Sequence, residues 1–111
     1  MTIVIDINET SSGSPSGWSF NTQKFTENAF LKQIIIKPAT TTTAYHLYIQ
    51  DGTINSNLVF DTRTEGRKIT GTLRREVNIP LVGIHTVVVT GANKNEIFKG
   101  KLVIAEGSQY V

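Results

Sequence analysis

Two histidines are the only side chains in this 111-residue sequence with an ordinary pKa near neutral pH, where acid–base catalysis operates. His46 and His85 each stand alone in a stretch of alternating apolar residues, with no serine or acidic partner at a catalytic spacing. The nucleophile-elbow, zinc-protease and phosphate-loop patterns are also missing. A glycosidase-type pair of carboxylates, which any two strands could bring together, stays open. We expect two ordinary strand histidines and no enzyme activity.

One stretch resembles a calcium-binding loop, because oxygen-bearing side chains recur at alternate positions between residues 51 and 57. The stretch contains a single carboxylate, Asp51, and has no distal glutamate to bind the ion with two oxygens. Its negative charge is therefore too low for calcium. The Asp51-Gly52 pair is a strong turn signal, so we predict a hairpin loop here and no metal or cofactor site.

A basic cluster lies between residues 63 and 75, opposed there only by Glu65. Its members are Arg63, Arg67, Lys68, Arg74 and Arg75. Three interpretations stay open: an edge strand protected against strand addition, a surface that docks on an acidic partner, or a contact with a phosphate backbone. Nucleic-acid modules usually interleave aromatic residues for stacking, and only Phe60, just outside the cluster, comes near. We expect docking or edge protection, and no nucleic acid.

Three aromatic residues follow a Gly/Ser/Pro-rich stretch at residues 11–17. Trp18, Phe20 and Phe25 stand there among polar neighbours. They could fold back over their own domain, or they could bury against another subunit, where aromatic residues concentrate binding energy. We expect partner contacts from all three.

The composition indicates one soluble β-rich domain. The hydrophobic fraction is 39% and the charged fraction 18%, and thirteen Ile and nine Val stand against one Met. There is no cysteine, and no stretch has the length of a signal peptide or a membrane-spanning helix. We expect a chain that is made and kept soluble in the cytoplasm. The net charge of +2 is unevenly spread, since the first 31 residues are net acidic and the rest net basic.

Period-two alternation and turn residues predict seven or eight strands, and therefore an all-β antiparallel sandwich that is Ig-like or jelly-roll-like. In the strand expected at 30–37, Phe30, Ile34 and Ile36 share one face and Leu31 and Ile35 the other. A short helix over 22–32 is the alternative, and its apolar spacing fits poorly. The predicted strands lie at 2–8, 30–37, 44–51, 58–60, 68–76, 77–81, 84–90 and 97–105.

The chain divides into two parts in this interpretation. Residues 1–28 form a strand and an extended arm that is loosely tied to the rest, and residues 29–111 form the sandwich core. Such an arm could spread over neighbouring subunits.

The segments AYHLYIQDG (44–52), LVFD (58–61) and VNIPLVGIHTV (77–87) are short, cysteine-free, Thr-, Asn- and Ile-rich strands. In this texture, and in the arm before them, the chain resembles small β-sandwich virion proteins of tailed bacteriophages, especially capsid decoration (cement) proteins. The resemblance implies a trimer or dimer on the capsid exterior that braces capsomer junctions. Its partners would be the major capsid protein or other virion proteins, with no membrane involved, and its place would be the virion.

Two other functions remain. A tail, baseplate or fibre component would share every feature above. A free carbohydrate-binding sandwich would need aromatic rings on one exposed face, but Tyr45 and Tyr48 are expected on opposite faces of their strand.

Overall fold

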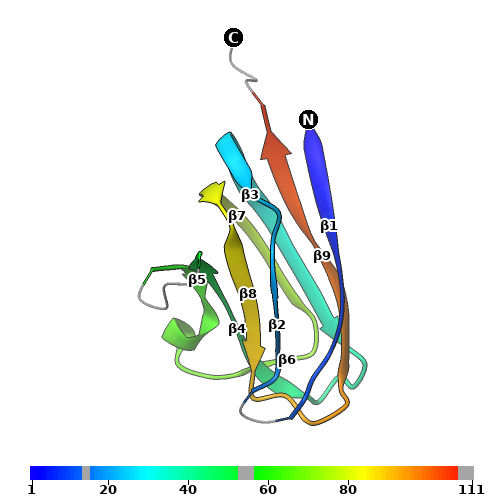
Figure 1. Ribbon diagram of the computed structural model, residues 1–111. Coiled ribbons are helices and arrows are strands. Elements are labelled where there is room, and N and C mark those ends of the chain that lie inside the picture. Colours follow the sequence, from blue (N-terminus) through cyan, green and yellow to red (C-terminus); the bar gives the residue numbers. More distant parts are fainter. Residues whose placement is uncertain (14–15, 53–56, 108–111) are drawn as a thin grey trace.

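The computed structural model of this protein describes residues 1–13, 16–52 and 57–107, and these residues are nearly all β-structure (Figure 1). One 3-10 turn, η1 (Thr62–Glu65), interrupts the strands. The strands are β1 (Thr2–Thr10), β2 (Trp18–Asn21), β3 (Phe25–Pro38), β4 (Ala44–Asp51), β5 (Leu58–Asp61), β6 (Ile69–Thr70), β7 (Leu73–Gly83), β8 (His85–Thr90) and β9 (Ile97–Glu106).

Two antiparallel sheets pack face to face, which confirms the predicted all-β sandwich. The first sheet has four strands in the order β1-β9-β3-β7. The second has the order β2-β8-β4-β5, with the short β6 also paired to β4. In Figure 1 the long strands of the first sheet extend beyond the second, and the start of β1 and the end of β9 lie at that extended end.

The core lies between the sheets and is built from alternate residues of each strand. In β9, Phe98, Leu102 and Ile104 point inward and are almost fully buried, as their spacing predicts. Tyr45 and Phe98 meet edge to face, with their ring centroids 5.2 Å apart. The core residues are Ile7, Trp18, Phe25, Ala29, Leu31, Ile34, Ile36, Tyr45, Leu47, Ile49, Leu73, Leu81, Val87, Val89, Ala92, Phe98, Leu102 and Ile104.

A β-bulge in β3 changes which of its side chains point into the core. The register of β3 shifts between Leu31 and Gln33 against both β7 and β9, and against β9 Lys32 is an extra residue. Leu31 and Ile34 are consequently both buried, and the next inward residue is Ile36. The prediction that Phe30 shares a face with Ile34 and Ile36 is therefore wrong. Phe30 lies on the opposite, outer face with Ile35.

The first 28 residues belong to the sandwich, in contrast to the expected loosely tied arm. β1 pairs with β9 along all nine of its residues, and β2 pairs with β8. Gly17 packs so closely on β8 that an added Cβ would lie 1.8 Å from the carbonyl oxygen of Val89. Ile7 of β1 and Trp18 of β2 are both buried in the core between the two sheets. The described part of the Gly/Ser/Pro-rich stretch thus leads from one sheet to the other.

Strand β7 forms one edge of the four-stranded sheet, as Pro80 suggests. Proline has no N–H to donate to a neighbouring strand, so it is tolerated at an edge. Gly71, where an interruption was predicted, has a φ of 69° and lies between β6 and β7, which belong to different sheets. The predicted polar strand over 68–76 is accordingly two strands.

Candidate interaction surface

The two histidines lie on opposite sides of the second sheet. His46 faces outward from β4, and its Nδ1 lies 3.3 Å from the hydroxyl oxygen of Thr62. His85 is buried in β8 at 2% exposure, and its Nε2 lies 3.7 Å from Asp51 Oδ1, beyond hydrogen-bonding distance. Its Nδ1 has no hydrogen-bond partner among the residues that the structure describes. The two imidazoles therefore do not share a site.

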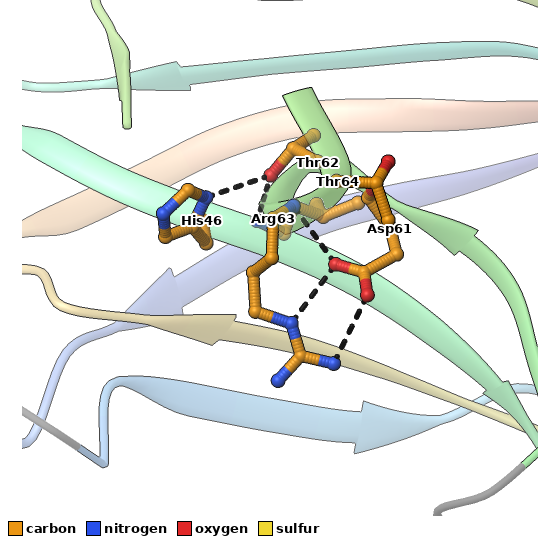
Figure 2. Close-up of polar contacts among 6 residues, drawn as sticks. His46, Asp61, Thr62, Arg63 and Thr64 are labelled. Carbon is orange, nitrogen blue, oxygen red and sulfur yellow. Dashed lines mark hydrogen bonds and ion pairs between the residues drawn. The ribbon is translucent and has the colours of Figure 1, made fainter. Parts of the chain in front are cut away.

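Residues 61–64 form a compact polar network that attaches η1 to β4 (Figure 2). Asp61 precedes the turn with an extended backbone, and its Oδ1 accepts the backbone N–H of Arg63 at 2.9 Å. The buried Thr62 hydroxyl accepts the backbone N–H of Leu47 at 2.9 Å. Gly66 ends the turn with a φ of 87°, which glycine adopts without strain. This network is structural, and it accounts for the position of His46.

Arg63 is held against both a carboxylate and an aromatic ring. Its guanidinium donates to the two oxygens of Asp61 at 2.9 and 3.2 Å, and it stacks 4.0 Å from the ring centroid of Tyr48. Burial raises the pKa of Asp61, but the hydrogen bonds and charge of Arg63 outweigh it and hold that pKa below the ordinary value. The same hydrogen bond raises the pKa of Arg63. Arg63 is thus an internal partner.

The other members of the predicted basic cluster do not form one patch. Arg75 points to the inner side of the four-stranded sheet, where it makes a 2.7 Å ion pair with Glu65 of η1. Arg74, the preceding residue, points to the outer side. Arg67 and Lys68 are exposed between η1 and β6. Neighbouring residues on a strand face opposite ways, so proximity in the sequence separates these cations in space.

The three aromatic residues predicted as partner contacts pack within their own chain. Trp18 and Phe25 are 5% and 1% exposed, respectively. Phe20 is half-buried and stacks on Trp18, with the ring centroids 6.0 Å apart. The indole Nε1 of Trp18 finds no hydrogen-bond partner in its buried position. In this conformation Trp18 and Phe25 are too deeply buried to contact a partner. Of the two alternatives, packing on their own domain or burial against another subunit, the structure favours the first.

A different set of cations lies together on the outer face of the four-stranded sheet. Lys37 of β3 and Lys99 of β9 are direct cross-strand partners there. Two rows further, Lys101 of β9 faces Ile35, and Ile35 faces Arg74 of β7. We call the four exposed residues Lys37, Arg74, Lys99 and Lys101 the basic face. Within the described part of the chain, none of the four makes an ion pair or a side-chain hydrogen bond.

Few acidic groups balance the basic face. Asp6 lies beside Lys101 on β1, and Glu76 on β7 accepts a 2.7 Å hydrogen bond from Gln33. Apolar side chains share the surface: Val4 and Ile97 are 50% and 42% exposed, respectively. The face is therefore a positively charged surface with apolar residues between the charges. Surfaces of this kind attract and orient acidic partners.

Sequence reasoning identified only Arg74 among these four residues. The period-two pattern did contain a signal, because Lys99 and Lys101 alternate with the inward Phe98 and Leu102. The addition of Lys37 depends on how β3 and β9 are aligned, and the chain between them gives no indication of that register.

Comparison with known protein families and with curated proteins finds no match to this chain. Within residues 1–13, 16–52 and 57–107, no group of three or more His, Cys, Asp or Glu side chains could hold a metal ion. The described residues also contain no helix with the length and apolar character to cross a bilayer. The hairpin loop predicted at residues 51–57 lies partly outside the described residues, at 53–56.

Proposed function

We propose that this protein is a non-catalytic structural domain that docks onto a larger protein assembly through the basic face. The single observation on which the proposal rests is the exposed, unpaired set Lys37, Arg74, Lys99 and Lys101 on one sheet face. If the resemblance to decoration proteins holds for function, the larger assembly is a virion. The basic face then binds an acidic region on the outside of the capsid.

Edge protection does not explain these cations. Charged residues commonly protect edge strands from pairing with other chains, and Arg74 lies on the edge strand β7. The three lysines lie on β3 and β9, the two central strands of the sheet, whose hydrogen bonds are already made. A partner that lies across the face, and not along an edge, fits this position. Repetition of such contacts over a symmetrical particle lets each one be weak.

A carbohydrate-binding function finds less support in the described residues. Tyr45 is buried and Tyr48 lies under Arg63, so neither ring offers a free surface for a sugar. Trp18 is also buried. A tail, baseplate or fibre location would use the same basic face, and the experiment below separates it from a capsid location.

The test is co-sedimentation of the purified protein with tailed-phage capsids and, separately, with tails, at low and high salt. We expect salt-sensitive binding to capsids, because the contact depends on exposed charges. The double substitution Lys101→Glu with Arg74→Glu should abolish it. The matched control is Arg67→Glu with Lys68→Glu, which makes the same change of charge between η1 and β6 and should leave binding intact.

Each remaining result contradicts part of the proposal. Binding to tails alone assigns the protein to the tail. Capsid binding that survives the Lys101→Glu and Arg74→Glu substitutions excludes the basic face, and the absence of binding to any particle excludes the virion assignment.

A further inference from the structure

A pocket of about 370 Å³ opens where β3 ends and β9 begins, at one end of the basic face. Its lining residues are Lys37, Pro38, Ala39, Ile97 and Lys99. The apolar members form most of the wall, and the two lysines supply its only charged groups. This combination of an apolar wall with a few polar groups is typical of ligand sites. The volume corresponds to roughly a dozen water molecules, taking about 30 Å³ for each.

The two lysines of the pocket are in an unfavourable arrangement unless an anion joins them. Lys37 and Lys99 are direct cross-strand partners, and like charges in such pairs destabilise a sheet. On the far side of Lys99 the cross-strand neighbour is the uncharged Asn8. Neither lysine makes an ion pair within the described residues. A negative charge between the two ammonium groups would turn this repulsion into attraction.

Among the described residues, no carboxylate lines the pocket to supply this charge. Glu96 is the carboxylate nearest in sequence, but its Oε2 accepts the backbone N–H of Thr40 at 2.6 Å. It is 9% exposed and does not line the pocket. The anion must therefore come from a ligand.

The pocket's backbone favours a carboxylate over a phosphate. Phosphate sites typically present several backbone N–H groups or an arginine fork. Here Pro38 has no N–H, and the N–H of Ala39 donates to the carbonyl of Ile97 at 2.8 Å. No aromatic ring lines the pocket, whereas rings are what unpaired bases stack on. Ile97, 42% exposed, offers contact to an apolar group beside the anion.

We propose that this pocket binds an acidic segment of a partner protein, with one carboxylate held between Lys37 and Lys99 and a neighbouring apolar side chain against Pro38, Ala39 and Ile97. The proposal rests on the proposed docking function, since the pocket lies within the basic face, and it names the chemistry of the partner. The carboxylate replaces water around two exposed ammonium groups, so a single segment binds weakly and many repeated sites are needed for firm attachment.

The experiment is a titration of the isotope-labelled full chain by NMR. The probe is a capped peptide of alternating glutamate and leucine, and the first control is the same peptide with glutamine for glutamate. We expect shift changes at the amides of Ala39, Ile97 and Lys99 with the acidic peptide only. The double substitution Lys37→Gln with Lys99→Gln should weaken binding roughly tenfold, as the loss of two exposed ion pairs predicts. Lys24→Gln, an exposed lysine outside the sheets, should leave it unchanged.

Other outcomes overturn the proposal. Equal binding of the glutamine peptide, shifts that map elsewhere, or unchanged affinity after the double substitution would each show that the lysine pair does not select a carboxylate. Inorganic phosphate or duplex DNA that binds at the pocket more tightly than the peptide would assign it to phosphate groups. Capsid binding that is lost with Lys101→Glu and Arg74→Glu, together with a peptide that ignores the pocket, would retain the docking function and exclude this site.

Discussion

Asp61 shows how much of the second sheet depends on a single carboxylate. It caps η1 through the backbone N–H of Arg63 and fixes the guanidinium that stacks on Tyr48. Thr62, the next residue, is then positioned to accept the N–H of Leu47. The sequence indicated a turn around Gly66, but Tyr48 and Leu47, which contact Arg63 and Thr62 respectively, lie on β4, more than ten residues away. The contacts of Arg63 within its own chain could not be predicted from its charge alone, and its expected role in partner binding stays a prediction.

This carboxylate should make stability depend on pH in a defined direction. Because the folded-state pKa of Asp61 is lowered, its stabilisation is fully present above the unfolded value of about 3.9 and is lost as the pH falls through the folded pKa. Asp61→Asn keeps an oxygen that can cap the turn but removes the ion pair with Arg63, so it should lower the free energy of unfolding by at most about 1 kcal/mol at neutral pH. It should also flatten the loss of stability below roughly pH 4. Urea unfolding followed from neutral to acid pH measures both effects.

Glu9→Gln is the matched control, because Glu9 lies opposite the apolar Phe98 and its side chain makes no hydrogen bond or ion pair with the described residues. It should leave the neutral-pH stability nearly unchanged. An equal loss in both variants would show that the Asp61 contacts do not contribute specifically.

At the scale of elements, alternation predicted the inward faces of β1, β4 and β9, and the structure confirms them. It failed in β3, because the bulge at Lys32 reverses the alternation halfway along the strand. A bulge depends on how two partner strands accommodate an extra residue, and a single strand's pattern does not contain that information. The same limit applies to the pair of Lys37 and Lys99, which exists only through the β3–β9 register.

The β3–β9 register makes a prediction about stability that is separate from binding. Lys99→Glu places a carboxylate directly opposite Lys37, so repulsion becomes attraction and the free energy of unfolding should rise by about 0.5 kcal/mol. The gain should shrink at high salt, which screens exposed charges. Thermal or urea unfolding at two salt concentrations measures it. Lys24→Glu makes the same change of charge outside the sheets and should bring no comparable gain; a loss of stability with Lys99→Glu would contradict the register.

At the scale of the whole molecule, the fold class was predictable, and the division into an arm and a core was not. The Gly/Ser/Pro-rich stretch suggested a loose connection, yet residues on either side of it pair with opposite sheets. Long-range pairing of this kind, in which β1 joins β9 at the other end of the sequence, is invisible to local patterns. Of the aromatic residues assigned to a partner, Trp18 and Phe25 are consequently core residues, and Phe20 is a half-buried residue packed against the core. The expected dimer or trimer stays a prediction.

Removal of residues 1–28 distinguishes an arm from an integral part of the sandwich. An arm would leave a folded domain behind. The structure predicts unfolding instead, because the deletion removes both β1 and β2 and takes Ile7, Trp18 and Phe25 from the core. Each buried side chain of this size contributes roughly 1.5–3 kcal/mol, so the loss approaches the whole stability of a small domain. Circular dichroism and a cooperative thermal transition measure the outcome.

The point variant Phe25→Ala tests the same question, whether residues 1–28 are part of the folded domain, with the full chain kept. Phe25 is 1% exposed and lies 6.4 Å from the His85 ring, so its removal should leave a cavity and cost about 3–5 kcal/mol. Met1→Ala, at a side chain that is 80% exposed, is the control and should have little effect. A stable domain after the deletion, together with only a small loss of unfolding free energy in Phe25→Ala, would contradict the structure. Residues 1–28 would then form an arm that is free to contact a partner. If the deletion variant is unfolded, residues 1–28 are an integral part of the domain and not a free arm. The basic face then stays the proposed surface for partner binding.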